Sequence, residues 1–142
     1  MTEDSTSNEQ QQPGPVEAAV RRPDETEELY TEERCHILEI SGRLDDPGLS
    51  IARARVEPGV TTQLHALDIA ERYVILSGQG EMELGTAESD SPSLDAMPVA
   101  PGDVVLIPPR VPQRITNTGQ EDLVFLCLCT PAWRDGVYRA LE

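Results

Sequence analysis

Three side chains near the middle of the sequence, His65, Glu71 and Gln113, could together bind a metal ion. They offer an imidazole nitrogen, a carboxylate and an amide oxygen, and each of these groups can ligate a metal. Side chains alternate between the two faces of a strand, so residues two apart share a face. If the three groups meet inside a barrel, we expect an open metal site in which water or substrate completes the coordination.

The donor set also indicates the ion and the chemistry. One nitrogen and two oxygens suit Mn²⁺ or Fe²⁺ better than a soft ion, and we expect a divalent metal (Mn, Fe, Ni or Zn) as cofactor. Tyr73 lies two residues after Glu71 and offers a hydroxyl that could move a proton. Arg110 stands at a turn between strands, where its guanidinium could orient an anionic substrate group. We therefore predict Tyr73 and Arg110 as catalytic residues.

The same side chains have structural interpretations. His65 is equally a neutral histidine hydrogen-bonded within a barrel, and Glu71 is equally a carboxylate paired with an arginine such as Arg72 or Arg110. Arg110 is equally an exposed turn residue. Because an unpaired buried carboxylate is costly, Glu71 needs some partner if its side chain points inward.

Seven segments from Cys35 onward have the length and β-branched or alternating composition of strands, and they are separated by turns rich in Gly, Pro, Asp and Asn. Many short strands without a long helical pattern predict an all-β sandwich or barrel. In one of them Arg53 and Arg55 share a face, which must be wet or held against acidic groups. The segments read CHILEIS, LSIARARVE, RYVILSG, GEMEL, DVVLIPP, QRITN and DLVFLCLCT.

The length suits one core with appendages, so we predict a barrel over residues 34–132. Residues 1–33 are acidic and poor in apolar side chains, which predicts a flexible N-terminal arm. Residues 133–142 carry apolar side chains spaced four apart, which predicts a short C-terminal helix. The polar stretch from Gly85 to Met97 predicts an exposed loop within a hairpin.

Two stretches resemble the signature motifs of the cupin superfamily. At the His, His, Glu and Gly that follow the opening glycine of the first motif, this chain has His65, Leu67, Glu71 and Gly78. At the Gly, Pro, Gly, His and Asn of the second motif it has Gly102, Pro108, Arg110, Gln113 and Asn117. The resemblance to small single-domain cupins implies a double-stranded β-helix, or jelly-roll barrel. Leu67 and Gln113 depart from it at two of the four usual metal-ligand positions.

The resemblance implies a metal-dependent isomerase, lyase or dioxygenase that holds a small polar organic ligand in the barrel. Because Leu67 cannot bind a metal, a metal-free module that binds or senses a small molecule without catalysis is the alternative. The resemblance also implies a homodimer, with residues 35–41 as a candidate exchanged edge strand.

Composition limits the partners and the location. The formal net charge is −15, with 26 acidic residues against 11 basic ones, so nucleic acid and anionic membranes are not expected partners. No apolar run approaches the roughly 20 residues that span a bilayer, and the N-terminus lacks a signal-peptide pattern, so we expect a cytoplasmic protein. The three cysteines, Cys35, Cys127 and Cys129, fit buried core positions, although the last two share a strand face and could act together.

Overall fold

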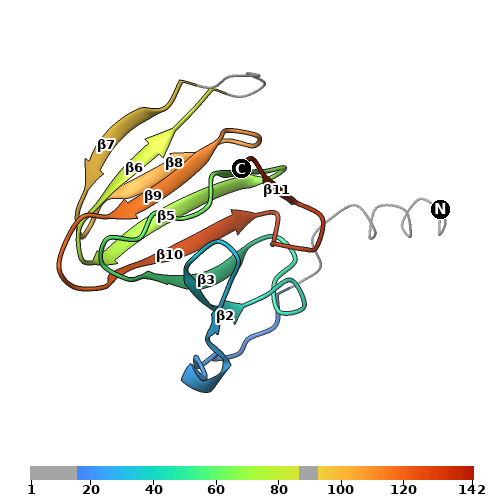
Figure 1. Cartoon of the computed structure of the whole chain (residues 1–142). Coiled ribbons are helices and arrows are strands. Elements are labelled where there is room, and N and C mark those ends of the chain that lie inside the picture. The colour runs from blue at the N-terminus through green and yellow to red at the C-terminus, as the bar shows by residue number, and fades with distance from the viewer. Residues whose placement is uncertain (1–15, 87–92) are drawn as a thin grey trace.

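The computed structural model describes residues 16–86 and 93–142 as two antiparallel sheets that face each other (Figure 1). The first sheet contains six strands and the second contains five. In the order of the first sheet, the strands are β1 (Leu29–Tyr30), β2 (His36–Ser41), β3 (Ser50–Val56), β10 (Leu123–Thr130), β5 (Ala70–Ser77) and β8 (Val104–Ile107). In the order of the second sheet, they are β11 (Tyr138–Ala140), β4 (His65–Leu67), β9 (Gln113–Asn117), β6 (Gly80–Leu84) and β7 (Asp95–Val99).

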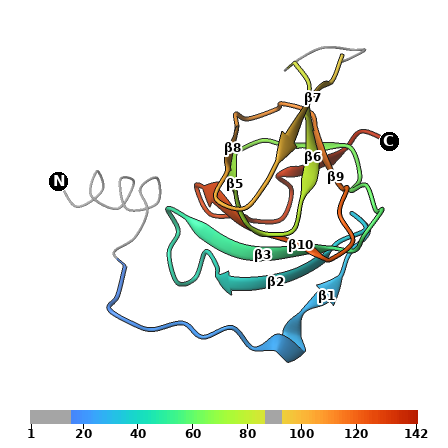
Figure 2. The same cartoon turned by 90° about the vertical axis from the view of Figure 1, so that its left-hand side faces the viewer.

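Figure 2 shows the two sheets curving around a common interior. Strands distant in sequence are neighbours within each sheet, because β10 pairs with both β3 and β5, and β9 pairs with both β4 and β6. All seven predicted segments form strands, and the predicted all-β jelly-roll barrel is confirmed. Such long-range pairing lets residues from separate motifs reach one interior site.

Alternation along β5 and β9 decides which side chains face the interior. On β5 the buried positions are Glu71, Tyr73 and Ile75, two residues apart, as a strand requires. On β9 the same period buries Gln113 and Ile115. Apolar side chains such as Ile75 and Ile115 form the core, and the polar positions at the same end of each strand point into the same interior.

The prediction of a C-terminal helix is wrong. Residues 138–140 form β11, which pairs antiparallel with β4, and its register places Ala140 opposite His65. Gly136 adopts a φ of 94°, which a continuous right-handed helix does not allow. Of the apolar residues spaced by four, Val137 is buried in one cluster with Leu67, whereas Leu141 is exposed, so they do not form one packed face.

The predicted loop from Gly85 to Met97 is shorter than expected. Its last three residues, from Asp95 onward, belong to β7 and pair with β6. Residues 87–92 lie outside the described residues. The segment therefore joins β6 to β7, which pair with each other as the predicted hairpin.

The described part of the N-terminal arm runs along the first sheet (Figures 1 and 2). After the short 3-10 helix η1 (Glu25–Glu27), β1 pairs with β2. Glu28 accepts hydrogen bonds from Arg53 and Arg55, so the arginine face of β3 is held against acidic groups. Across residues 16–86 and 93–142, no helix has the length and apolar character needed to cross a membrane.

Candidate functional site

A cavity of about 230 Å³ lies inside the barrel. Its walls are mainly apolar, with aromatic rings from Tyr73, Phe125 and Trp133. Its titratable lining comes from the arm, β2, β4, β5 and β10. These side chains are Glu33, Cys35, Glu39, His65, Glu71, Tyr73, Cys127 and Cys129.

Glu71 lies at the end of a hydrogen-bonded chain that crosses between the sheets. Its side chain is buried, and its Oε1 accepts a hydrogen bond of 3.0 Å from Nε2 of Gln113. The Oε1 of Gln113 in turn accepts a hydrogen bond of 2.6 Å from the Tyr73 hydroxyl. The thiol of Cys129 lies 3.6 Å from the other carboxyl oxygen, Oε2 of Glu71. Gln113 therefore links the two sheets and holds the carboxyl group in place.

The Glu71 carboxyl has an unusual protonation equilibrium. Burial raises its pKa from 4.5 to about 7, and the nearby charge of Glu33 adds to the rise. The hydrogen bonds from Gln113 and Cys129 act in the opposite direction because they favour the charged form. Near neutral pH, Glu71 can therefore either donate or accept a proton.

His65 lies in β4 beneath the ring of Tyr138, with the ring centroids 4.7 Å apart. Its Nδ1 is 2.8 Å from the carbonyl oxygen of Gln63, which can only accept, so the proton of the neutral ring is on Nδ1. Burial lowers the pKa of His65 and favours this neutral form, although the bond to Gln63 opposes the shift. The unprotonated Nε2 is left as an acceptor on the cavity side.

Glu33 faces His65 and is the site residue that the sequence analysis missed. Its Oε1 lies 3.7 Å from Nε2 of His65, too far for a direct hydrogen bond. Burial raises the pKa of Glu33 to about 7. Within the described residues, neither this carboxyl group nor Nε2 of His65 makes a hydrogen bond. Two polar groups therefore face one another with no protein partner between them.

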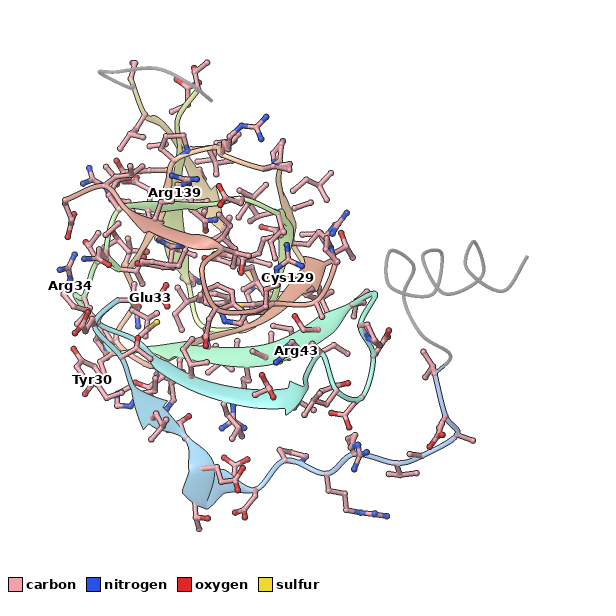
Figure 3. The ribbon with its side chains drawn as sticks, turned by 90° about the vertical axis from the view of Figure 1, so that its right-hand side faces the viewer. Tyr30, Glu33, Arg34, Arg43, Cys129 and Arg139 are labelled. Carbon is pink, nitrogen blue, oxygen red and sulfur yellow. The ribbon has the colours of Figure 1, made fainter. Side chains whose placement is uncertain are left out.

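The backbone around Glu33 explains how an arm residue reaches the cavity. The amide of Gln63 donates to the Glu33 carbonyl at 3.0 Å, and Nε of Arg34 donates to the Thr61 carbonyl at 2.8 Å. Arg34 has a φ of 68°, which turns it away from Glu33. In Figure 3 Arg34 lies at the edge of the view, and Glu33 lies closer to its centre. Cys35, just before β2, and Ile37 of β2 also line the cavity.

The structure brings together some of the predicted site residues and separates others. Glu71, Gln113 and Tyr73 form one hydrogen-bonded chain, and His65 faces the same cavity from β4. Arg110 is exposed and is not among the residues that line the cavity. Its amide donates to the Leu67 carbonyl at 2.7 Å, and its φ is 68°, so Arg110 serves the turn that precedes β9.

As arranged, Gln113 does not act as a ligand of the predicted metal centre. Gln113 uses its oxygen to accept from Tyr73 and its NH₂ group to donate to Glu71, so its oxygen is not directed at a shared ion. Leu67 is buried at a second ligand position. In residues 16–86 and 93–142, no group of three or more His, Cys, Asp and Glu side chains is placed to hold a metal ion.

Comparison with known proteins identifies the family. The sequence profile described as "Cupin domain" matches residues 52–129, more than half of the chain. The chain belongs to the cupin family. This cupin is 43% identical over 61 residues to the glucose-6-phosphate isomerase of Pyrococcus abyssi, and the match covers 43% of this chain and 31% of the isomerase. It is 35% identical over 85 residues to an uncharacterized protein of Methanocaldococcus jannaschii, covering 59% of this chain and 62% of that protein.

Solved structures show the same fold. An oxalate decarboxylase of Bacillus subtilis aligns with a TM-score of 0.68 at 23% identity, covering 82% of this cupin and 30% of the decarboxylase. The formate complex of the Lactobacillus farciminis enzyme aligns with a TM-score of 0.65 at 19% identity, covering 85% of this chain and 33% of that one. At this identity the likeness establishes the barrel alone. Because this cupin spans less than a third of the isomerases, their activity is not carried over by the match.

We expect Glu71 to make the stability of the protein depend on pH. Between its ordinary pKa of 4.5 and the folded value of about 7, the folded protein binds more protons at Glu71 than the unfolded chain does. The free energy of unfolding must therefore fall as the pH rises through this range. Relative to Glu71→Gln, the wild type should lose up to about 3 kcal/mol between about pH 5 and about pH 8, as measured by urea denaturation.

The exposed residue Glu81 supplies the matched control, because Glu81→Gln removes a carboxyl group outside the cavity. Its stability should follow that of the wild type at every pH. Identical pH profiles for the wild type and Glu71→Gln would contradict the assignment of the raised pKa to Glu71.

Proposed function

We propose that this cupin binds a small organic molecule in its cavity and transfers a proton on it. The observation that supports this proposal is the arrangement of three proton-exchanging groups around one cavity: Glu71, Glu33 and His65. The pKa values of the two carboxyl groups are raised to about 7, which suits acid–base work at neutral pH. An apolar cavity with a few polar groups is typical of a small-molecule site.

Each residue has a distinct role in this proposal. Glu71 donates or accepts the proton, and His65 accepts through Nε2 while the Gln63 carbonyl fixes its tautomer. Glu33 is the second acid–base carboxyl group, and its Oε1 lies opposite Nε2 of His65. Tyr73 and Gln113 act as positioning residues, because the Tyr73 hydroxyl donates to Gln113 and burial raises the pKa of Tyr73 well above its usual range. Arg110 is outside the cavity and has no role in this proposal.

Of the three reaction types considered, these groups favour two. Isomerisation and elimination both require a proton to leave one atom and another to be delivered nearby, which paired acids and bases provide. The proposed reaction class is therefore an isomerase or a lyase, and binding without turnover is the alternative that kinetic measurement separates from it.

A divalent metal is a second candidate, favoured by one observation. His65 leaves Nε2 free on the cavity side while Nδ1 is held by a backbone carbonyl, which is the tautomer that a metal-binding histidine uses. A decarboxylase relative with the same fold is described by its Mn(II) centres. For Gln113 to join His65 and Glu71 as a ligand, its oxygen would first have to leave Tyr73.

The substrates named for the relatives are anions, namely glucose 6-phosphate and oxalate. Neither arginine nor lysine is found among the described residues that line the cavity. The cavity lining therefore gives no reason to propose either anion as a substrate of this chain.

The ligand and metal contents can be measured on protein purified without chelator or nickel resin. We expect a small organic molecule to be released on denaturation and detected by mass spectrometry, with less than about one tenth of an equivalent of Mn, Fe, Ni or Zn. Ala52→Phe, which adds a ring to the cavity wall, should abolish the organic ligand. Stoichiometric metal that is lost in His65→Ala would instead establish the second candidate. An empty cavity in the wild type would contradict the proposal if added ligands also failed to bind.

We also propose a homodimer formed through the outer face of β5 and β8. β8 is an edge strand of the first sheet, and its Val104 and Leu106 side chains are 55% and 67% exposed beside Leu76 of β5. Apolar side chains gathered on one face are typical of an interaction surface. The predicted exchanged strand at residues 35–41 is less suited, because β2 is paired on both sides.

Light scattering during size-exclusion chromatography tests this interface. The wild type should elute as a dimer, and Leu106→Glu should elute as a monomer, because a buried charge opposes association. Leu44→Glu, at a residue that is also exposed but lies away from this face, should remain a dimer. A monomeric wild type, or a dimeric Leu106→Glu, would contradict the interface.

A further inference from the structure

We propose that the cavity selects a small organic cation, such as a primary alkylammonium, over neutral and anionic molecules of the same size. This inference rests on the proposed ligand binding and adds the chemical class of the ligand. It follows from the charge of the lining, from two acceptors, Nε2 of His65 and Oε1 of Glu33, that make no hydrogen bond to a described residue, and from the aromatic walls.

The charge of the lining is one-sided. Three glutamates line the cavity, Glu33, Glu71 and Glu39, and the described lining contains no arginine or lysine. Glu71 is buried, Glu33 is partly buried with a quarter of its side chain exposed, and Glu39 is exposed. An anion entering this cavity would meet carboxyl groups without a compensating cation, whereas a cation would stabilise their charged forms.

The unpartnered acceptors fit an ammonium group. Nε2 of His65 and Oε1 of Glu33 lie 3.7 Å apart, and neither makes a hydrogen bond to any described residue. A single nitrogen donor can lie within hydrogen-bond distance of both atoms. An ammonium has three N–H donors and no acceptor, so it can satisfy both atoms and still direct a donor elsewhere in the cavity.

Aromatic walls favour an organic cation. The rings of Tyr73 and Phe125 lie 4.3 Å apart by their centroids, and Trp133 also lines the cavity. Aromatic faces attract cations and also bury alkyl carbons. A volume of about 230 Å³ exceeds what a bare ion fills, so an alkyl chain can occupy the remainder.

The side chains around the two carboxyl groups supply no positive charge that is directed at them. Glu71 faces Gln113, Tyr73, Cys129 and Glu33, and all of these except Glu33 are uncharged near neutral pH. The charged groups nearest Glu33 do not neutralise it, because Arg34 is directed to the Thr61 carbonyl and to Glu142.

The remaining titratable groups around Glu33 are uncharged near neutral pH. They are Cys35, which precedes β2, His65 of β4, Cys127 of β10 and Tyr138 of β11. A bound ammonium therefore meets no competing cation among the described groups that line the cavity.

Three molecules of matched size and different charge test the inference: n-butylammonium, 1-butanol and butyrate. Each is titrated into the wild-type protein by calorimetry in the presence of a chelator at constant ionic strength. We expect n-butylammonium to bind about tenfold more tightly than butanol, because its hydrogen bonds are charge-assisted, and butyrate to bind most weakly.

Glu33→Gln should reduce the affinity for n-butylammonium to about that of butanol and leave butanol binding unchanged. Glu81→Gln, outside the cavity, should behave as the wild type. Equal or tighter binding of butanol or butyrate by the wild type would overturn the inference. If that binding were blocked by Ala52→Phe, the proposed small-molecule function would stand while its charge preference failed. Absence of binding by all three molecules would overturn the preference for a cation as well.

Discussion

The carboxyl group of Glu71 lies inside the barrel, where an ionised carboxylate without a cation would cost several kcal/mol. Two features of the site reduce this cost. Burial raises the pKa of Glu71 to about 7, so the neutral form is accessible near neutral pH. Gln113 and Cys129 hydrogen-bond to its two oxygens, so neither oxygen is left without a partner. The amide of Gln113 therefore influences the protonation of Glu71, because its hydrogen bond favours the charged carboxylate.

The same constraint explains why the site is assembled from distant segments. Gln113 comes from the second sheet and Glu71 from the first, so their hydrogen bond joins the two layers of the barrel. Glu33 arrives from the arm and is fixed by the backbone amide of Gln63, next to the strand that carries His65. Tyr138 of the C-terminal strand stacks on His65 and donates to Gln63 at 2.6 Å. Arm, sheet and C-terminal strand thus converge on one pair of acceptors.

The parts of the fold that alternation determines were predictable from the sequence. The seven segments with strand composition form strands, and the period of two correctly places Glu71 and Tyr73 on one inward face. The C-terminal segment was mispredicted because apolar residues spaced four apart satisfy a helix pattern locally, whereas pairing with β4 decides the structure. Local periodicity contains no information about that distant partner.

The site was only partly predictable for a similar reason. The motif spacing led to His65, Glu71 and Gln113, but hydrogen bonding decides that Gln113 serves Glu71 and Tyr73 rather than a shared ion. Glu33 lies in a stretch whose composition indicates a flexible arm, so its inward position has no compositional signal. Glu33 lies in the turn that precedes β2, with Arg34 at a φ of 68°, so strand alternation does not extend to Glu33 and gives no signal for its inward position.

The central claim is that two carboxyl groups inside this cupin titrate near neutral pH. Nuclear magnetic resonance of protein carrying ¹³C-labelled glutamate carboxyl groups tests it directly. The account predicts two resonances with midpoints near 7, one lost in Glu33→Gln and the other in Glu71→Gln. If every glutamate titrated near the ordinary value of 4.5, the buried carboxyl groups would be ionised at neutral pH, and the account would be contradicted.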